Sequence, residues 1–232
     1  MNWSVNLPGW MNKIGHSPAI GLSTPPIGCV LYLPGVPGGG NKIYDRSPYG
    51  NIGTITGAVW KRLPSGLWYL DFDGSDDYVA TPYYPDDSAK TFMYWLNCRA
   101  ISGDYACGVN DGSNHRFYAG IDKDGNCFFG MGDSSKYTVA SGITADNWYL
   151  ISITGDGLTA RYYVNAIEKD NFSYSQSGDS IEPFYVGVLK TLAGVTAKIN
   201  GLVALPRVCN RVLSPLEIQN HFNREKHLFG VW

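Results

Sequence analysis

The stretch from Trp68 to Pro82, WYLDFDGSDDYVATP, constrains the fold of this chain more than any other. Apolar and aromatic residues alternate with more polar ones up to Asp73, a Gly-Ser step interrupts the alternation, and it resumes at Tyr78. Alternation with a period of two is typical of β-strands. Asp-Gly favours a tight turn, because glycine adopts positive φ without steric cost and aspartate accepts hydrogen bonds from nearby backbone groups. The pattern predicts a β-rich protein, with two strands joined by a polar turn here.

Three other segments accompany this stretch in a fixed order. They are YDRSPYGNIGT at residues 44–54, NWY at 147–149 with RYYVN at 161–165, and PRVCNRVLS at 206–214. Together with F-D-G-x-x-D-Y-V at residues 72–79, they resemble the laminin-G-like branch of the concanavalin A-like lectin/glucanase superfamily. The resemblance covers residues 27–222. It implies an all-β jelly-roll sandwich of two antiparallel sheets, and it does not by itself imply a function.

The composition fits one β-sandwich domain and excludes several partners. The 232 residues are 44% hydrophobic and include 28 Gly and 13 Pro, as in all-β proteins with many turns. The formal charge of −2 arises without a run of either sign, so we expect no nucleic-acid partner. We expect neither membrane insertion nor classical export, because no apolar stretch is long enough. The five cysteines lack metal-binding spacings and are expected to be free, buried thiols.

The chain divides into an arm, a domain and a tail. Residues 1–26 lack sustained periodicity and predict an extended N-terminal arm, followed by a laminin-G-like jelly-roll domain at residues 27–224. The segment SPLE at residues 214–217 is a capping box with proline at the first helical position, and it predicts one short C-terminal helix. Residues 225–232 are then an apolar tail. Because arm and tail both carry tryptophan, we expect both to be covered, by the sandwich itself or by a neighbouring subunit.

No catalytic residue is predicted, although the superfamily includes glucanases. Glycoside hydrolysis needs two carboxylates held across a sugar, which the glucanase branch carries in an E-x-D-x-x-E type strand. The four glutamates of this chain lie in no such pattern. Asp71 and Asp73 share a strand face, but Asp73 borders a turn that explains its presence. We therefore expect a protein that is not an enzyme.

Three aspartates, Asp73, Asp76 and Asp77, form a candidate metal site because they lie within five residues. Calcium takes six to eight oxygen ligands, commonly including carboxylates. Calcium sites at the rim of the sandwich are often found in the laminin-G and pentraxin proteins that the chain resembles. The acidic pair of the family's late strand is absent, since this chain has NGLVAL at residues 200–205. Calcium as a cofactor and a purely structural role of the aspartates in the turn both stay open.

A second candidate site is a polar loop that follows a strand-like segment. Its candidate ligand-binding residues carry amide, carboxylate, imidazole and guanidinium groups, and they are Asn110, Asp111, Asn114, His115 and Arg116. Such donors and acceptors suit the hydroxyl groups of a glycan. They suit a solvated hairpin equally, so both interpretations stay open.

Two classes of function fit these features. One is a lectin-like module that recognises a glycan or a cell-surface ligand; the other is a structural subunit of a larger particle with no glycan ligand. A recognition fold made without an export signal is typical of proteins that phages and viruses encode, because virion proteins assemble in the cytosol. We therefore expect a lectin-like protein on the virion surface, present as a homo-oligomer or bound to capsid proteins. A free extracellular carbohydrate-binding module is the alternative.

Overall fold

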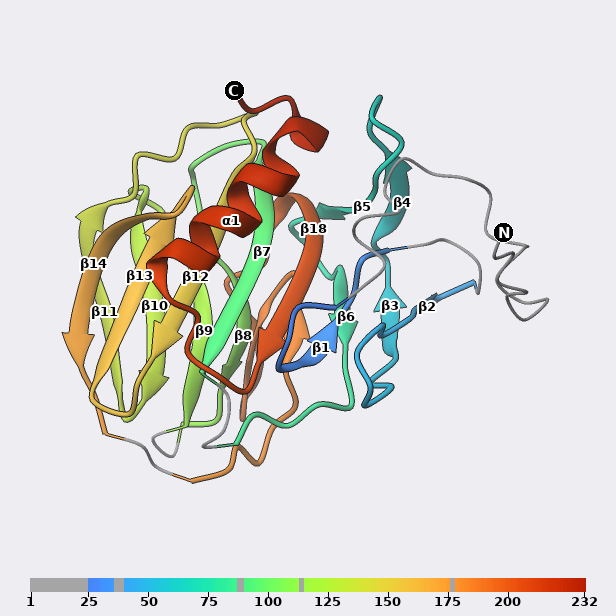
Figure 1. Ribbon diagram of the computed structural model, residues 1–232. Helices are drawn as coiled ribbons and strands as arrows, with labels where there is room; N and C mark the ends of the chain where they lie inside the picture. The colour runs from blue at the N-terminus through green and yellow to red at the C-terminus, as the bar shows by residue number, and fades with distance from the viewer. Residues whose placement is uncertain (1–24, 36–39, 87–89, 113–114, 176–177) are drawn as a thin grey trace, which may run out of the picture.

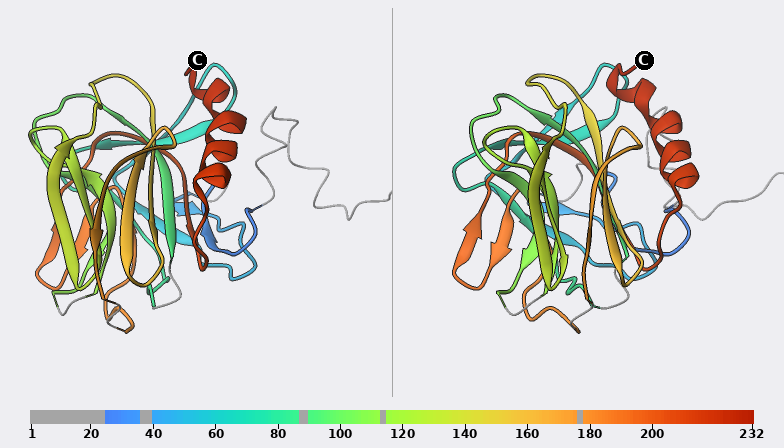
Figure 2. Two further views of the ribbon diagram at one scale, coloured as in Figure 1. Left: turned by 60° about the vertical axis from the view of Figure 1, so that its left-hand side comes forward. Right: turned by 90° about the vertical axis from the view of Figure 1, so that its left-hand side faces the viewer.

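The computed structural model describes residues 25–35, 40–86, 90–112, 115–175 and 178–232, which form two β-sheets packed face to face (Figures 1 and 2). Sheet A contains, in spatial order, β14 (Ile167–Ser173), β13 (Thr159–Val164), β12 (Tyr149–Gly155), β7 (Thr91–Cys98), β18 (Asn200–Cys209), β5 (Trp68–Asp73) and β4 (Val59–Arg62), and β1 (Cys29–Tyr32) also pairs with β18.

Sheet B contains β11 (Ser134–Ala140), β10 (Asn126–Gly132), β9 (Arg116–Ile121), β8 (Tyr105–Asn110), β15 (Tyr185–Val186), β6 (Tyr78–Ala80), β3 (Gly53–Thr56) and β2 (Lys42–Ile43). Beside this row, β16 (Leu189–Thr191) pairs with β17 (Gly194–Thr196) and runs parallel to β8. The other strand pairs in the described residues are antiparallel. The predicted all-β jelly-roll sandwich of two antiparallel sheets is confirmed.

The core between the sheets is aromatic, and two tyrosines of sheet A cross it. The Tyr94 hydroxyl donates to the carbonyl oxygen of Ala119 at 2.8 Å, and the Tyr162 hydroxyl donates to that of Gly120 at 2.6 Å. Both acceptors lie on β9 of sheet B. A buried hydroxyl needs a partner, so these two bonds fix how the sheets are placed relative to each other.

The turn after β5 carries the chain from one sheet to the other. β5 belongs to sheet A and β6 to sheet B, so the Asp-Gly step at residues 73–74 links the two layers and does not close a hairpin within one sheet. Gly74 has φ 81, as the turn chemistry predicts. The aspartates that follow Gly74 are thereby placed at the rim of the sandwich.

A single α-helix, α1 (Pro215–Glu225), covers the outer face of sheet A and continues into the 3-10 helix η3 (Lys226–Phe229) (Figures 1 and 2). The predicted capping box forms, since the Ser214 hydroxyl accepts from the Glu217 N–H and the Glu217 carboxylate accepts from the Ser214 N–H. No helix in the described part of the chain has the length and apolar character needed to cross a lipid bilayer.

Part of the predicted apolar tail, residues 225–232, packs on the chain's own sandwich. Leu228 and Phe229 are buried within their own chain, where the Phe229 ring stacks on Trp95 with the ring centres 4.1 Å apart. Their apolar surface is therefore covered by sheet A and is not free for association between subunits. Trp232, at the end of the chain, is 95% exposed. Residues 1–24 of the predicted arm lie outside the described residues.

Candidate ligand and metal site

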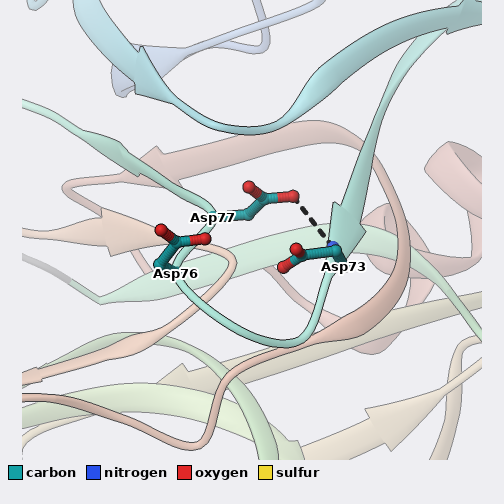
Figure 3. Close-up of side chains that lie close together, drawn as sticks. All are labelled: Asp73, Asp76 and Asp77. Atoms are coloured by element: carbon teal, nitrogen blue, oxygen red, sulfur yellow. Dashed lines mark hydrogen bonds between the residues drawn. The ribbon is translucent and has the colours of Figure 1, made fainter.

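Three carboxylates meet where the chain crosses between the sheets. Asp73 ends β5, and Asp76 and Asp77 lie in the turn before β6. One carboxylate oxygen from each lies within 4.8 Å of the others (Figure 3). Asp73 and Asp76 are exposed, whereas Asp77 is buried. The three predicted metal ligands are therefore brought together at the rim of the sandwich.

Asp77 has a structural role in this cluster. Its Oδ2 accepts a hydrogen bond from the backbone N–H of Asp73 at 2.8 Å (Figure 3). Gly57 lies against the carboxylate so closely that a Cβ atom there would be 1.8 Å from Oδ1. Burial raises the pKa of Asp77, the Asp73 N–H lowers it, and the negative charges of Asp73 and Asp76 raise it further, so the net shift is upward. Mutual repulsion of these carboxylates is thus part of the site.

A divalent cation would relieve that repulsion, and the donors fit calcium. Calcium is bound by six to eight oxygens at about 2.3–2.6 Å, so ligand oxygens less than about 5 Å apart can share one ion. Asp73, Asp76 and Asp77 would supply three such oxygens. Asp73 also accepts from the Ser75 N–H at 2.7 Å, which is the structural role expected in the turn. The two interpretations of the aspartates are therefore compatible with each other.

An open groove of about 460 Å³ adjoins Asp73. It combines carboxylate, ammonium, amide and hydroxyl groups with one tyrosine, and its lining residues are Asp73, Gly74, Gly103, Asp104, Tyr105, Thr196, Ala197, Lys198 and Asn200. Arg99 donates to the Asn200 Oδ1 at 3.0 Å and thereby orients the amide. Hydrogen-bond donors and acceptors converge in this concave site, and they include both positively and negatively charged groups. Such a site suits a polyhydroxylated ligand. Of these residues, the sequence had indicated only Asp73.

The predicted polar loop is organised differently from a free binding loop. Asp111 is fully buried, and its carboxylate accepts from the backbone N–H groups of His115 and Ile181 at 3.2 Å each. Its Oδ2 also lies 2.9 Å from the His115 Nδ1. In this conformation Asp111 therefore holds the loop together and does not face solvent.

The remaining residues of the loop lie around this buried carboxylate. The Asn110 Oδ1 accepts from the Gly112 N–H at 3.2 Å, and the Arg116 guanidinium donates to the carbonyl oxygen of Asp133 at 2.6 Å. Asn114 lies outside the described residues. A ligand at this loop would thus meet Asn110, His115 and Arg116.

The groove and the loop are separate sites. Tyr105 of the groove begins β8 and Asn110 of the loop ends it. Five steps along a strand span roughly 17 Å. Substitutions at the two ends of β8 can therefore distinguish binding at one site from binding at the other.

Asp71 is arranged for structure and not for acid–base chemistry. It is buried, its Oδ2 lies 2.5 Å from the Lys61 Nζ, and Arg99 donates to its Oδ1. Burial raises the pKa of Asp71, but the hydrogen bonds and charges of Lys61 and Arg99 outweigh it, so that the net shift is downward. A carboxyl group held ionised in this way is a poor proton donor at neutral pH.

Comparison with known families agrees with the fold. The family model described as the concanavalin A-like lectin/glucanases superfamily matches residues 73–219. No curated protein sequence matches the chain. The match begins at Asp73 and extends into α1, so it contains β7 and β18 of sheet A, β8 and β9 of sheet B and every residue that lines the groove.

Several solved structures share the fold. The chain resembles the binding domain of Paraclostridial Mosquitocidal Protein 1 (TM-score 0.67, 14% identity, covering 88% of this chain and 55% of that one). It also resembles the receptor binding domain of botulinum neurotoxin D (TM-score 0.63, 12% identity, 85% and 53%). A third similar structure is domain 4 of AbnA, a GH43 extracellular arabinanase from Geobacillus stearothermophilus, in complex with arabinotriose (TM-score 0.59, 15% identity, 83% and 97%). The chain spans about half of each toxin binding domain.

Proposed function

This chain belongs to the concanavalin A-like lectin/glucanase superfamily, and we propose that it is a non-catalytic glycan-recognition protein which binds sugar in the groove beside Asp73. The observation that carries the proposal is the groove itself, in which Lys198, Asp104 and Asn200 surround a space of about 460 Å³. Similar structures include two binding domains of toxins and an arabinanase domain that holds arabinotriose, which supports recognition over catalysis.

The groove offers complementary partners to sugar hydroxyls. Lys198 and Asn200 can donate hydrogen bonds, and Asp73 and Asp104 can accept them. Calcium held by Asp73, Asp76 and Asp77 would supply a positive charge to which further hydroxyl oxygens can bind. Lys123 donates its backbone N–H to the Asp104 Oδ1 at 3.0 Å, which fixes one of the acceptors before a ligand arrives.

Glycan-array screening followed by calorimetry with the strongest glycan tests the proposal. We expect Lys198→Ala to weaken binding by about tenfold or more, since one hydrogen bond to a charged group contributes about 1.5–3 kcal/mol. Lys42→Ala, on the exposed edge strand β2, is the matched control and should leave affinity unchanged. If the protein binds no glycan on the array, the proposed lectin function is wrong.

The predicted loop is the competing binding site, and the same experiment decides between the two. Arg116→Ala should not change affinity if the ligand occupies the groove. If Arg116→Ala abolishes binding while Lys198→Ala leaves it intact, the ligand binds at Asn110, His115 and Arg116, and the groove assignment is wrong.

The finer proposal is display on a phage or virus particle, with residues 1–26 as the attachment segment to a homo-oligomer or to capsid proteins. Light scattering of the full chain should then give a multiple of 25.5 kDa, and a chain beginning at residue 27 should remain folded with a lower mass. An oligomer that binds no glycan would favour a purely structural subunit. A monomer that binds glycan would favour a free extracellular module.

A further inference from the structure

Two buried thiols contact each other between the first and the last strand of sheet A. Cys29 of β1 and Cys209 of β18 are cross-strand partners, and their Sγ atoms are 3.0 Å apart. Cys29 is 3% exposed and Cys209 is fully buried. The two residues are 180 positions apart in the sequence. Nothing in the sequence pattern indicated that they would meet.

The backbone at this pair has the geometry that a cross-strand disulfide requires. The neighbouring Asn210 N–H donates to the Gly28 carbonyl at 2.8 Å, whereas the Cys29 N–H donates to Pro26 at 3.1 Å. Because hydrogen-bonded and non-hydrogen-bonded pairs alternate in an antiparallel ladder, Cys29 and Cys209 occupy a non-hydrogen-bonded position. Their Cα atoms are then about 4.5 Å apart, within the range of about 4.4–6.8 Å that disulfides span.

The other cysteines provide an internal comparison. Cys98, Cys107 and Cys127 are also buried, in the core between the two sheets. The Sγ of Cys107 accepts from the Gly187 N–H at 3.2 Å. All five cysteines belong to the described part of the chain, and within it the structure joins only Cys29 and Cys209 by a thiol–thiol hydrogen bond.

The groups around the two thiols shift their pKa values in opposite directions. The hydrogen bond with Cys29 lowers the pKa of Cys209, burial raises it, and the positive charges of Arg207 and Arg211 lower it, with a net shift downward. The same hydrogen bond and burial raise the pKa of Cys29. The thiolate is the reactive form of cysteine, and the positive charges of Arg207 and Arg211 favour it at Cys209.

We propose that Cys29 and Cys209 form a reversible disulfide in an oxidising medium, which ties β1 covalently to β18. In the first step the Cys209 thiolate attacks one sulfur of a low-molecular-weight disulfide such as glutathione disulfide, whose S–S bond breaks and releases one thiolate. Cys29 then loses its proton and attacks the Cys209 sulfur of the mixed disulfide, releasing the second thiolate. Two protein thiols are oxidised to one disulfide, and one glutathione disulfide is reduced to two thiols.

The burial of both sulfur atoms determines when the reaction occurs. An oxidant reaches Cys209 when β1 separates from β18 or before β1 has paired with it. Disulfides persist outside the reducing cytosol, so the bond would form in protein that has reached an oxidising environment. This disulfide would close a covalent loop of residues 29–209, which contains nearly the whole sandwich.

Oxidation of the full-length wild-type protein tests the proposal. The protein is incubated natively with glutathione disulfide, refolded from denaturant in a glutathione redox buffer, and compared with a sample kept in a phosphine reductant. We expect the intact mass to fall by two hydrogen atoms and a non-reducing peptide map to link the peptides of Cys29 and Cys209. The melting temperature should rise by about 5–10 °C, since the bond closes a very long loop.

Matched variants show whether the bond between Cys29 and Cys209 causes the mass change and the rise in melting temperature. Cys29→Ser should lose both the mass change and the rise in melting temperature, whereas Cys98→Ala should keep both. If Cys29→Ser does not fold, the peptide map of the wild-type protein decides alone. Five free thiols after both treatments, or a bond that uses Cys98, Cys107 or Cys127, would overturn the proposal.

Discussion

Arg207 of β18 and Glu225 at the end of α1 form a bidentate ion pair inside the protein. The Nη1–Oε1 distance is 2.7 Å and the Nη2–Oε2 distance is 3.1 Å. Both side chains are almost completely buried. The Trp95 indole N–H donates to the same carboxylate at 2.7 Å. This ion pair anchors the helix to sheet A, at a residue that the sequence had placed in a separate tail.

Removing one partner of this pair should destabilise the protein strongly. Glu225→Ala leaves the charge of Arg207 buried and unpaired, and we expect the free energy of unfolding to fall by about 3–5 kcal/mol. The double variant Arg207→Met/Glu225→Leu should recover most of this loss, because it leaves no buried charge. The free energies of unfolding of the wild type, Glu225→Ala and the double variant are measured by unfolding in urea. A double variant as unstable as Glu225→Ala would contradict this account of the pair.

Acid should destabilise the protein over a window set by Glu225. Burial alone raises the pKa of Glu225, but the charge of Arg207, the nearby His221 ring and hydrogen bonds from Arg207 and Trp95 bring it down to about 2, from 4.5. Since the folded state has the lower pKa, this stabilisation is complete above pH 4.5 and is lost as the pH falls towards 2. The loss is on the order of 3 kcal/mol. Unfolding free energies of wild type and Glu225→Gln should converge over this window, and parallel curves would refute the assignment.

Calcium should stabilise the protein through the acidic cluster. A chelator is expected to lower the melting temperature and added calcium to restore it, because a ligand that binds only the folded state stabilises it. Asp76→Asn should abolish the calcium response without lowering the melting temperature in chelator, since Asp76 is exposed and its charge repels Asp77. A melting curve that chelator leaves unchanged would reduce Asp73, Asp76 and Asp77 to their roles in the turn.

The protein should release no reducing sugar from β-glucan or related polysaccharides. Asp71 is held ionised by Lys61 and Arg99, so it is a poor candidate for the proton donor that glycoside hydrolysis requires. The assay compares wild type with Asp71→Asn and Asp73→Asn. Release above the buffer background that disappears in either variant would establish a hydrolase.

Local patterns predicted the strands better than their arrangement. Alternation at residues 68–80 predicted β5 and β6, yet these strands lie in different sheets. Periodicity records only which side chains alternate along one strand, and it contains no information about the neighbouring strand. The capping box at residues 214–217, in contrast, predicted the start of α1, because all of its hydrogen bonds are local.

The edge strands β11 and β14 are polar, so their sequences give no clear strand pattern. Their sequences, SSKYTVA and IEKDNFS, carry charged residues that keep an exposed edge from pairing with other chains. Lys136 of β11 and Asp170 of β14 form an ion pair at 2.7 Å, which joins the two sheets at this edge. Stabilisation from the adjacent strands overrides the weak local preference of such segments.

The candidate site, too, could be predicted only where its residues are neighbours in the sequence. Asp73, Asp76 and Asp77 could be predicted because they are neighbours in the sequence. The groove could not, since it combines the end of β5 with residues 103–105 and 196–200, which only the folded sandwich brings together. Asp111 was predicted as a ligand contact because its type suits sugars, but its carboxylate accepts a hydrogen bond from the backbone N–H of Ile181, seventy positions away.

The position of β18 determines when the molecule can finish folding. This last strand lies in the middle of sheet A, between β7 on one side and β5 and β1 on the other. Until residues 200–209 have left the ribosome, sheet A consists of two halves with open edges that other nascent chains can reach. The sandwich therefore closes only after residues 200–209 have been synthesised, and a chain cut short before residue 200 keeps the open edges of both halves of sheet A exposed.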